Sequence, residues 1–296
     1  MQIKEYNRIF KYDTDFPLLV TYQSQKPTPH HSHEFVEIII IIAGSGIHET
    51  KFSRYRLDAG DVIIIPRNGY HGYLEVDDLE LMNVLFDPRQ LPLPMLDLYK
   101  LPGYNAMFGL ENDFFEQNRF YPKFHLDENS FDTISHLLGI MRQESENPTP
   151  GYRCCQMGYF MALLGNLCRL YTKNLERVHE PLLNMGSIIS YLNSNYSKNI
   201  NLSDILRKAG MSKSAFMRKF KQATGTTPID YLIQLRVTKA SCLLQETNLS
   251  ISEIAYKSGF SDSNYFSRTF RKVTGLTPRE FSKHCRNNDI KSSPSA

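Results

Sequence analysis

The stretch that decides the fold is "GFSDSNYFSRTFRKVTGLTP", residues 259–278, which has a near copy in "GMSKSAFMRKFKQATGTTP", residues 210–228. Apolar residues occupy equivalent positions in the two copies, for example Phe220 in the first and Phe270 in the second. The second copy has one extra residue in its turn. Such self-similarity indicates a single structural unit that is used twice. We therefore expect the same structural unit to contact an elongated partner molecule at two points.

Each copy carries the signals that begin and end short helices. Ser250 and Glu253 form a capping box in the second copy, and Asn201 and Asp204 take the same places in the first. Further signals recur in step: Gly210 and Gly259 after the first helix, Ser212 and Ser261 before the second, and Thr227-Pro228 and Thr277-Pro278 before the third. A helix, a tight turn and a second helix in this order are typical of helix-turn-helix motifs.

Residues 229–244, between the copies, read as one continuous helix. These 16 residues would span about 24 Å, a spacing that can set two reading units near the ~34 Å repeat of the DNA major groove. The charge distribution agrees, because residues 180–296 hold 17 Lys and Arg against 8 Asp and Glu, whereas residues 1–179 hold 17 against 23. This asymmetry predicts that one end of the chain meets double-stranded DNA.

The outward side of the second helix in each copy supplies the expected DNA contacts. They are Lys213, Ser214, Met217, Arg218 and Lys221 in the first copy and Ser263, Asn264, Ser267, Arg268 and Arg271 in the second. Arginine pairs bidentately with guanine and asparagine with adenine, so Arg218, Arg268 and Asn264 are expected to read bases. The two lysines and Arg271 are expected to bind phosphates. The alternative is that these faces are ordinary solvated helix surfaces.

Residues 18–87 read mainly as strands. The runs "FVEIIIIIAGSG", "YRLDAGDVIIIP" and "LELMNVLF" are rich in β-branched and other apolar residues and are bounded by glycine, proline or aspartate. Short strands with such turns predict an antiparallel barrel or sandwich. A proline-rich stretch, "LPLPMLDLYKLPGYNA", is expected to be irregular, and helices are expected over 130–146 and 153–174. The predicted fold class is therefore multidomain, with α and β parts.

An apolar stripe on the second of these helices repeats at the helical period. Its members are Met157, Phe160, Met161, Leu164, Leu167, Cys168 and Tyr171. The stripe either packs on its own barrel or forms the seam of a homodimer, and a wide stripe can serve both uses.

The stretch "RVTKASCLLQETNLSISEIAYKSGFSDSNYFSRTFRKVTGLTPREF" closely resembles the signature of the AraC/XylS family of bacterial transcription regulators, and the resemblance extends over residues 186–284. It implies a seven-helix DNA-binding domain in which a long helix joins two helix-turn-helix units. It also implies RNA polymerase as a partner and a homodimer formed through the 153–174 helix.

The N-terminal part resembles the cupins in "HSHEFVEIIIIIAG", residues 31–44, and in "GDVIIIP", residues 60–66, followed by His71. Asn68 stands where the second cupin motif usually has glycine, so that motif is imperfect. Sugar-responsive members of the AraC/XylS family have such a cupin-like barrel as effector domain. The stretch "DLELMNVLFDPRQLPLPMLDLYKLPGYNA" is also similar to the rhamnose-responsive members, which points to a sugar such as L-rhamnose.

Four residues of this barrel form a candidate binding set. His31, His33 and Glu37 would point to one side of a single extended strand. His71 would join them from a neighbouring strand, and such a set suits Zn, Fe, Mn or Ni. Three uses stay open: a former metal site that now hydrogen-bonds a sugar, a retained divalent metal that helps to bind the effector, or a structural role. The tyrosines that can offer a ring face to a sugar are Tyr22, Tyr70 and Tyr73.

We expect a cupin-like effector-binding and dimerisation domain over 1–175, a linker over 176–185, a double helix-turn-helix domain over 186–286 and a disordered tail over 287–296. The sequence starts without an apolar signal segment, and its longest apolar run is too short to cross a membrane. Five cysteines without paired C-x-x-C spacing indicate reduced thiols and a cytoplasmic protein.

Two rival functions belong to other classes. A cupin metal-dependent enzyme can use the same histidines and carboxylate, but it has no need of a duplicated helix-turn-helix unit. An architectural DNA binder without an effector would show weak sequence preference and no response to sugars. We therefore predict a sequence-specific transcription regulator, an activator and not an enzyme. It would respond to a small molecule in the barrel and require no cofactor.

Overall fold

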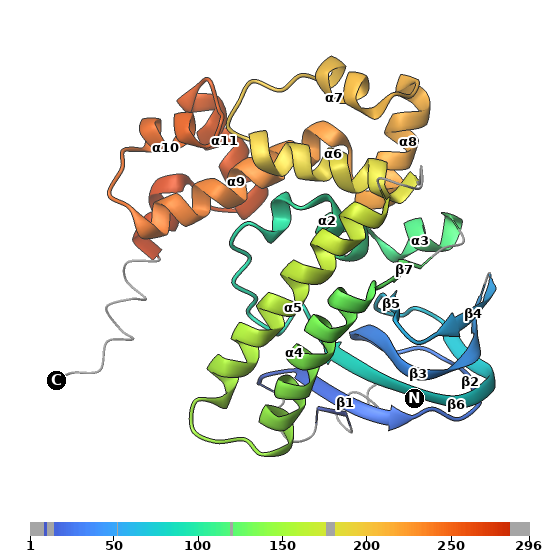
Figure 1. Ribbon diagram of the computed structural model, residues 1–296. Helices are drawn as coiled ribbons and strands as arrows, with labels where there is room; N and C mark the ends of the chain where they lie inside the picture. The colour runs from blue at the N-terminus through green and yellow to red at the C-terminus, as the bar shows by residue number, and fades with distance from the viewer. Residues whose placement is uncertain (1–8, 11–14, 52, 119–120, 176–180, 285–296) are drawn as a thin grey trace. The chain divides into compact units, whose positions relative to one another are not determined.

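The chain folds into two compact units, residues 1–187 and 188–296. The computed structural model describes residues 9–10, 15–51, 53–118, 121–175 and 181–284. The first unit combines an antiparallel sheet with helices, and the second unit is helical (Figure 1). The predicted multidomain fold, with a β-rich N-terminal part and an all-α C-terminal part, is confirmed.

The sheet of the first unit is antiparallel throughout the described residues. Its strands are β1 (Leu18–Ser24), β2 (Thr28–His31), β3 (Val36–Thr50), β4 (Arg54–Asp58), β5 (Asp61–Ile65), β6 (His71–Phe86) and β7 (Lys123–His125). They pair in the order β1-β6-β3-β5-β7, with β2 beside β6 and β4 beside β3. The two long strands, β3 and β6, therefore carry most of the sheet.

Helices follow the main strands. They are η1 (Leu98–Lys100), α2 (Pro102–Phe108), α3 (Asn112–Asn118), α4 (Glu128–Glu146) and α5 (Tyr152–Leu175). The helices predicted over 130–146 and 153–174 are confirmed as α4 and α5, which run side by side (Figure 1). The prediction that the proline-rich stretch is irregular is wrong at its end, because Pro102 begins α2 at a position where proline is favoured.

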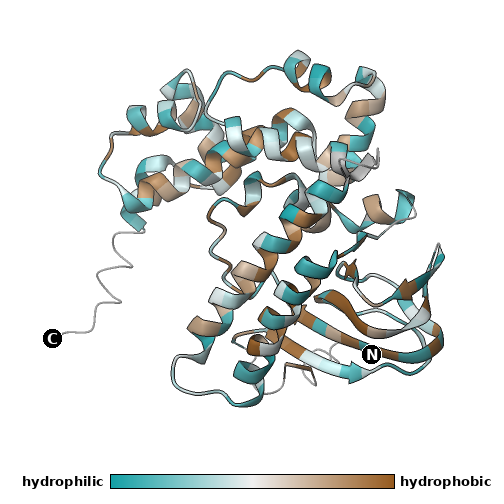
Figure 2. Ribbon diagram, in the orientation of Figure 1, coloured by the Kyte–Doolittle hydropathy of each residue, from teal (hydrophilic) through white to brown (hydrophobic). Residues whose placement is uncertain are grey.

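Alternate side chains of the sheet face two different environments. Ile38 and Ile40 of β3 are fully buried in a core that includes Phe160 and Leu164 of α5. Glu37, next to Ile38, lines a cavity on the other face. Figure 2 shows the centre of the sheet as mostly hydrophobic and the helices α4 and α5 as mixed, in keeping with one buried side on each.

The apolar stripe of α5 packs in the core that it shares with the sheet of its own unit. Its fully buried members are Phe160, Leu164, Leu167, Cys168 and Tyr171. Met157 and Met161 are partly buried against the same core. The stripe is therefore mostly covered within the chain, and its partly exposed members are Met157 and Met161.

Bulges bend the two long strands of the sheet. The pairing of β3 with β6 shifts register between Ile41 and Ala43 and at two later points. Gly44 has a φ of +73°, and a Cβ there would lie 2.0 Å from the carbonyl oxygen of Asp78. Only glycine fits this place, where an unpaired residue bends the strand and increases its twist.

The second unit consists of helices and turns. Its elements are α6 (Pro181–Asn195), which begins in the first unit, α7 (Leu202–Ala209), α8 (Lys213–Thr224), α9 (Pro228–Glu246), α10 (Ile251–Lys257), α11 (Ser263–Thr274) and helical residues 278–284. Helix α6 starts inside the predicted linker, whose residues 176–180 lie outside the described residues, as does the predicted tail. Among the described helices, none has the length and apolar character that crossing a membrane requires.

Local capping explains where the first helices of each copy begin. The predicted capping boxes are both present, at Asn201 and Asp204 of α7 and at Ser250 and Glu253 of α10. In each box the side chain of the first residue accepts a hydrogen bond from the amide of the second, and the side chain of the second accepts one from the amide of the first. Two amide donors that the helix itself leaves unpaired are thus satisfied.

The caps of the second helices differ between the copies. Ser212 caps α8 as expected, but the prediction for Ser261 is wrong, because Asp262 accepts from the amide of Tyr265 and caps α11. The extra residue in the second turn moves the helix start by one position. Thr227 caps α9, whose first residue is proline, as predicted.

We expect Gly259→Ala to destabilise the second unit more than Gly210→Ala. Both glycines have positive φ, but a Cβ at 259 would lie 2.5 Å from the carbonyl oxygen of Tyr196, whereas a Cβ at 210 meets nothing within 4 Å. Backbone conformation alone should cost about 1 kcal/mol at position 210, and the added clash should raise the cost to about 3 kcal/mol at position 259. Urea unfolding of the two variants measures this, and equal losses would contradict the packing of the second turn.

Candidate functional site

The structure places the ten residues of the expected DNA contacts on the outward sides of α8 and α11. The exposed ones are Lys213, Ser214, Arg218, Lys221, Asn264, Arg268 and Arg271, and the half-buried ones are Met217, Ser263 and Ser267. The hydroxyl of Ser267 donates to the carbonyl of Ser263 at 2.8 Å, so it is engaged within the helix. Each helix thus presents arginine with lysine or asparagine to solvent.

Helix α9 holds both helix-turn-helix units. The ring of Phe220 in α8 meets that of Tyr231 in α9 edge-on, with centroids 5.7 Å apart. Phe266 and Phe270 of α11 are fully buried in a core that includes Val237 of α9. Because one rigid helix contributes to both packings, the spacing of the two outward faces is fixed by α9.

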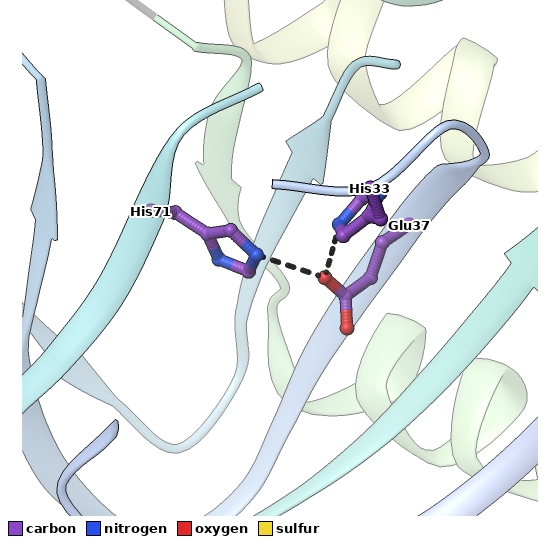
Figure 3. A group of neighbouring side chains, drawn as sticks. All are labelled: His33, Glu37 and His71. Carbon is purple, nitrogen blue, oxygen red and sulfur yellow. Dashed lines mark hydrogen bonds and ion pairs between the residues drawn. The ribbon is translucent and has the colours of Figure 1, made fainter. Parts of the chain in front are cut away.

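A second candidate site lies at the sheet of the first unit, where His33, Glu37 and His71 converge (Figure 3). His33 comes from the loop before β3, Glu37 from the start of β3 and His71 from the start of β6. The Nε2 atoms of His33 and His71 lie 3.1 Å and 3.4 Å from the same Glu37 Oε2. All three residues are buried, with 5%, 7% and 1% of their surfaces exposed for His33, Glu37 and His71.

The predicted single strand for His31, His33 and Glu37 is wrong, because β2 ends at His31 and β3 begins after a loop. His31 stays close, with its ring centroid 4.4 Å from that of His71, and its Nδ1 lies 3.2 Å from the carbonyl oxygen of Pro29. It does not belong to the cluster of ligand atoms that lie within 4.8 Å of one another. The structure therefore assembles three of the four predicted residues.

The ring of His33 lies between a backbone carbonyl oxygen and the carboxyl group of Glu37. Its Nδ1 lies 2.8 Å from the carbonyl oxygen of Phe35, which can only accept, so Nδ1 carries the proton. In the neutral ring, Nε2 then turns a lone pair toward the Glu37 carboxylate 3.1 Å away. Two acceptors at this distance need a proton or a cation between them, which either protonation of the ring or a bound cation would supply.

His48 is a part of this site that sequence reasoning missed. Its Nε2 lies 3.3 Å from His71 Nδ1, and its Nδ1 lies 2.9 Å from the hydroxyl of Tyr55. Burial lowers the pKa of His48 to about 3 and holds the pKa of His71 well below its usual value, because a charged ring would lose its hydration. Both rings are therefore neutral, and His48 with Tyr55 decides which nitrogen of His71 carries the proton.

Of the three predicted tyrosines, the structure brings only Tyr73 to the cavity. Tyr22 hydrogen-bonds Glu80 and lies under the guanidinium of Arg142 of α4, on the opposite face of β1. Tyr70 is 40% exposed and stacks on His30 with ring centroids 4.8 Å apart. Strand alternation turns Tyr22 away from the cavity, because its neighbour Gln23 lines the cavity.

The cavity at this site has a volume of about 390 Å³, within the range of small-molecule sites. Its wall contains three buried polar atoms without a hydrogen-bond partner: His71 Nε2, Tyr73 Oη and Asn83 Oδ1. The His71 atom lies 3.4 Å from Glu37 but lacks the geometry of a hydrogen bond. Buried polar atoms usually have partners, so this cluster is typical of a surface built to meet a ligand.

The donor set of the cluster fits a divalent cation. Two imidazole nitrogens and one carboxylate oxygen converge, and such ligands suit first-row transition metals. The carbonyl of Phe35 orients His33, and His48 orients His71, as outer partners orient ligating histidines in metal sites. Three protein ligands would leave positions open for oxygen atoms of a bound molecule.

Two domain families match this chain. The AraC-like ligand binding domain matches residues 18–150, and the helix-turn-helix domain matches residues 205–284. Their order agrees with the observed β-rich and helical units.

Relatives match over most of the chain. The HTH-type transcriptional activator RhaR of Mannheimia succiniciproducens is 31% identical over 257 residues, which cover 87% of this chain and 88% of that protein. The protein of the same name from Enterobacter sp. is 30% identical over 249 residues, 84% of each chain. A solved structure of ToxT from Vibrio cholerae matches with 14% identity and a TM-score of 0.34, covering 90% of this chain and 98% of that one.

The relatives are named as transcriptional activators, in agreement with the expectation of a regulator instead of an enzyme. The two matched domains and the identity over most of the chain lead to one assignment. This chain belongs to the AraC/XylS family of transcription regulators.

Proposed function

We propose that this protein is a cytoplasmic activator of transcription whose barrel cavity binds a small polyhydroxylated effector, with L-rhamnose as the first candidate. The observation that carries the proposal is the set of buried polar atoms without partners in the cavity wall, in a chain that also presents two basic helix-turn-helix faces. Relatives named RhaR, at 30% and 31% identity, support both the activator role and the choice of sugar.

The proposal assigns the effector and dimerisation role to residues 1–175 and DNA binding to residues 186–286, with 176–185 as linker. A homodimer that engages two DNA half-sites would form through α5, whose partly exposed side includes Met157 and Met161. RNA polymerase is the further partner that an activator needs. The effector can shift the balance between two arrangements of the protein only by binding one of them more tightly.

We expect Arg268→Ala to weaken binding to the preferred DNA sequence by about 1–3 kcal/mol and to relax the preference at one base position. Arg268 is exposed on α11, where its guanidinium can reach the edge of a guanine. Selection of bound sequences from a random library, followed by fluorescence anisotropy, measures both effects.

Lys272→Ala is the matched control, because it removes an exposed positive charge of α11 outside the expected contact set. It should lower the affinity for all sequences slightly and leave the preference intact. If Arg268→Ala weakens every sequence equally, Arg268 binds a phosphate and does not read a base.

A divalent cation is a second candidate occupant of the cavity, favoured by the convergence of ligand atoms from His33, Glu37 and His71 within 4.8 Å of one another. His33, Glu37 and His71 would hold it, and it would attract effector hydroxyl oxygens. This candidate predicts about one tightly bound metal ion per wild-type chain by elemental analysis. If the protein takes up no Zn, Mn, Fe or Ni, a cation is excluded as the occupant and direct binding of the sugar by the side chains remains.

His33→Ala should weaken the response of DNA binding to the effector and leave DNA affinity without effector nearly unchanged, because His33 lies in the first unit. The expected loss of effector affinity is on the order of 10-fold or more. His136→Ala on α4 is the control, since His136 is exposed and outside the cavity. An unchanged effector response in His33→Ala would place effector binding elsewhere.

A further inference from the structure

Tyr73 and Asn83 lie on the same strand, and both residues line the same cavity. Tyr73 is 4% exposed and Asn83 is 6% exposed. The hydroxyl of Tyr73 and Oδ1 of Asn83 are buried and have no hydrogen-bond partner in the described structure. An unsatisfied buried polar group costs stability, so a folded chain that keeps two of them in one cavity wall indicates a use outside folding.

The surroundings hold both side chains in place. Tyr73 packs against the rings of His48 and His71, with centroids 5.1 Å and 6.3 Å away. Asn83 sits in the middle of the sheet, paired with Thr21 of β1 and with Ile39 of β3. Because strand pairing and ring packing fix their positions, a ligand would meet preformed groups and lose little free energy in ordering them.

The chemistry of the cavity favours neutral hydroxyl groups. A phenol donates one hydrogen bond and accepts others, an amide does both, and Glu37 accepts. A hydroxyl group can donate to one of these groups while it accepts from another. Lys26, the one positively charged side chain of lysine or arginine type among the described residues of this wall, is exposed. The buried carboxylate of Glu37 disfavours a negatively charged ligand.

We propose that Tyr73 and Asn83 are the residues that determine which hydroxyl-bearing effector the cavity accepts, each through a polar atom that has no partner within the chain. This inference rests on the proposed function and adds specificity residues to it. Sites that hydrogen-bond a ligand hydroxyl reject analogues that lack it, because the protein groups are then left unpaired again.

The test separates a binding role from a structural role in two variants of the full chain, Tyr73→Phe and Asn83→Leu. Each removes the unpaired atom and keeps a similar volume. Without ligand, both variants should have a Tm equal to or above that of the wild type, because an unsatisfied polar atom is lost. Titration calorimetry with L-rhamnose should show affinities lower by on the order of 10-fold in each.

Tyr55→Phe is the matched control, because the hydroxyl of Tyr55 is paired with His48 Nδ1 at 2.9 Å. Its loss leaves the Nδ1 atom of a buried imidazole without a partner and should lower Tm by about 2–4 °C. A similar fall of Tm in Tyr73→Phe and Asn83→Leu would show that their polar atoms support the fold, which overturns the inference whatever the ligand.

The sugar panel distinguishes the two proposals. It includes L-rhamnose, L-mannose, which carries one more hydroxyl, and D-galacturonate, which carries a negative charge. Binding by the wild type that both variants leave unchanged overturns the specificity role alone, whereas no binding of any sugar by the wild type overturns the proposed function. Preference for D-galacturonate would contradict the assignment of a neutral ligand. Weaker binding in the variants, with a changed ranking of L-rhamnose and L-mannose, is the expected result.

Discussion

Successive side chains of β3 and β6 point to opposite faces of the sheet, and the first unit is organised around this alternation. One face carries Ile38 and Ile40 into the core with α4 and α5, where each buried side chain contributes about 2 kcal/mol. That packing fixes the register of the strands, because a slip by one residue would send these side chains into the cavity. The other face must then present Glu37 and Asn83 to the interior, a costly burial of polar groups that the fold accepts.

The bulges of β3 decide which side chains join the site. Glu37 has an odd number and faces the cavity, and without bulges every even-numbered residue of the strand would face away. The register shifts along β3 reverse this parity, so that His48 points inward and meets His71. The polar chain from Glu37 through His71 and His48 to Tyr55 thus exists because two strands bend, and the bend depends on Gly44.

Features that depend on neighbours in the sequence could be predicted, whereas features that depend on contacts between distant segments could not. Helix ends in the second unit depend on neighbours within four residues, and nearly every predicted cap and box is present, with Asp262 in place of Ser261 as the exception. The barrel site depends on contacts between distant strands. His33, Glu37 and His71 could be grouped from family spacing, but a loop separates His31 from Glu37, and His48 and Asn83 had no sequence signal. Tyr22 could have been excluded from the predicted cavity residues only if the pairing of β1 had been known, because that pairing decides which side chains of the strand face the cavity.

Hydrogen–deuterium exchange of the full chain, with and without saturating L-rhamnose, tests most directly whether the inner face of the sheet is an effector site. If it is, exchange should slow in residues 33–39 and 71–85, where the strands that carry the cavity wall would be held by the ligand. Slower exchange confined to the second unit, or no change anywhere in the barrel, would contradict the account.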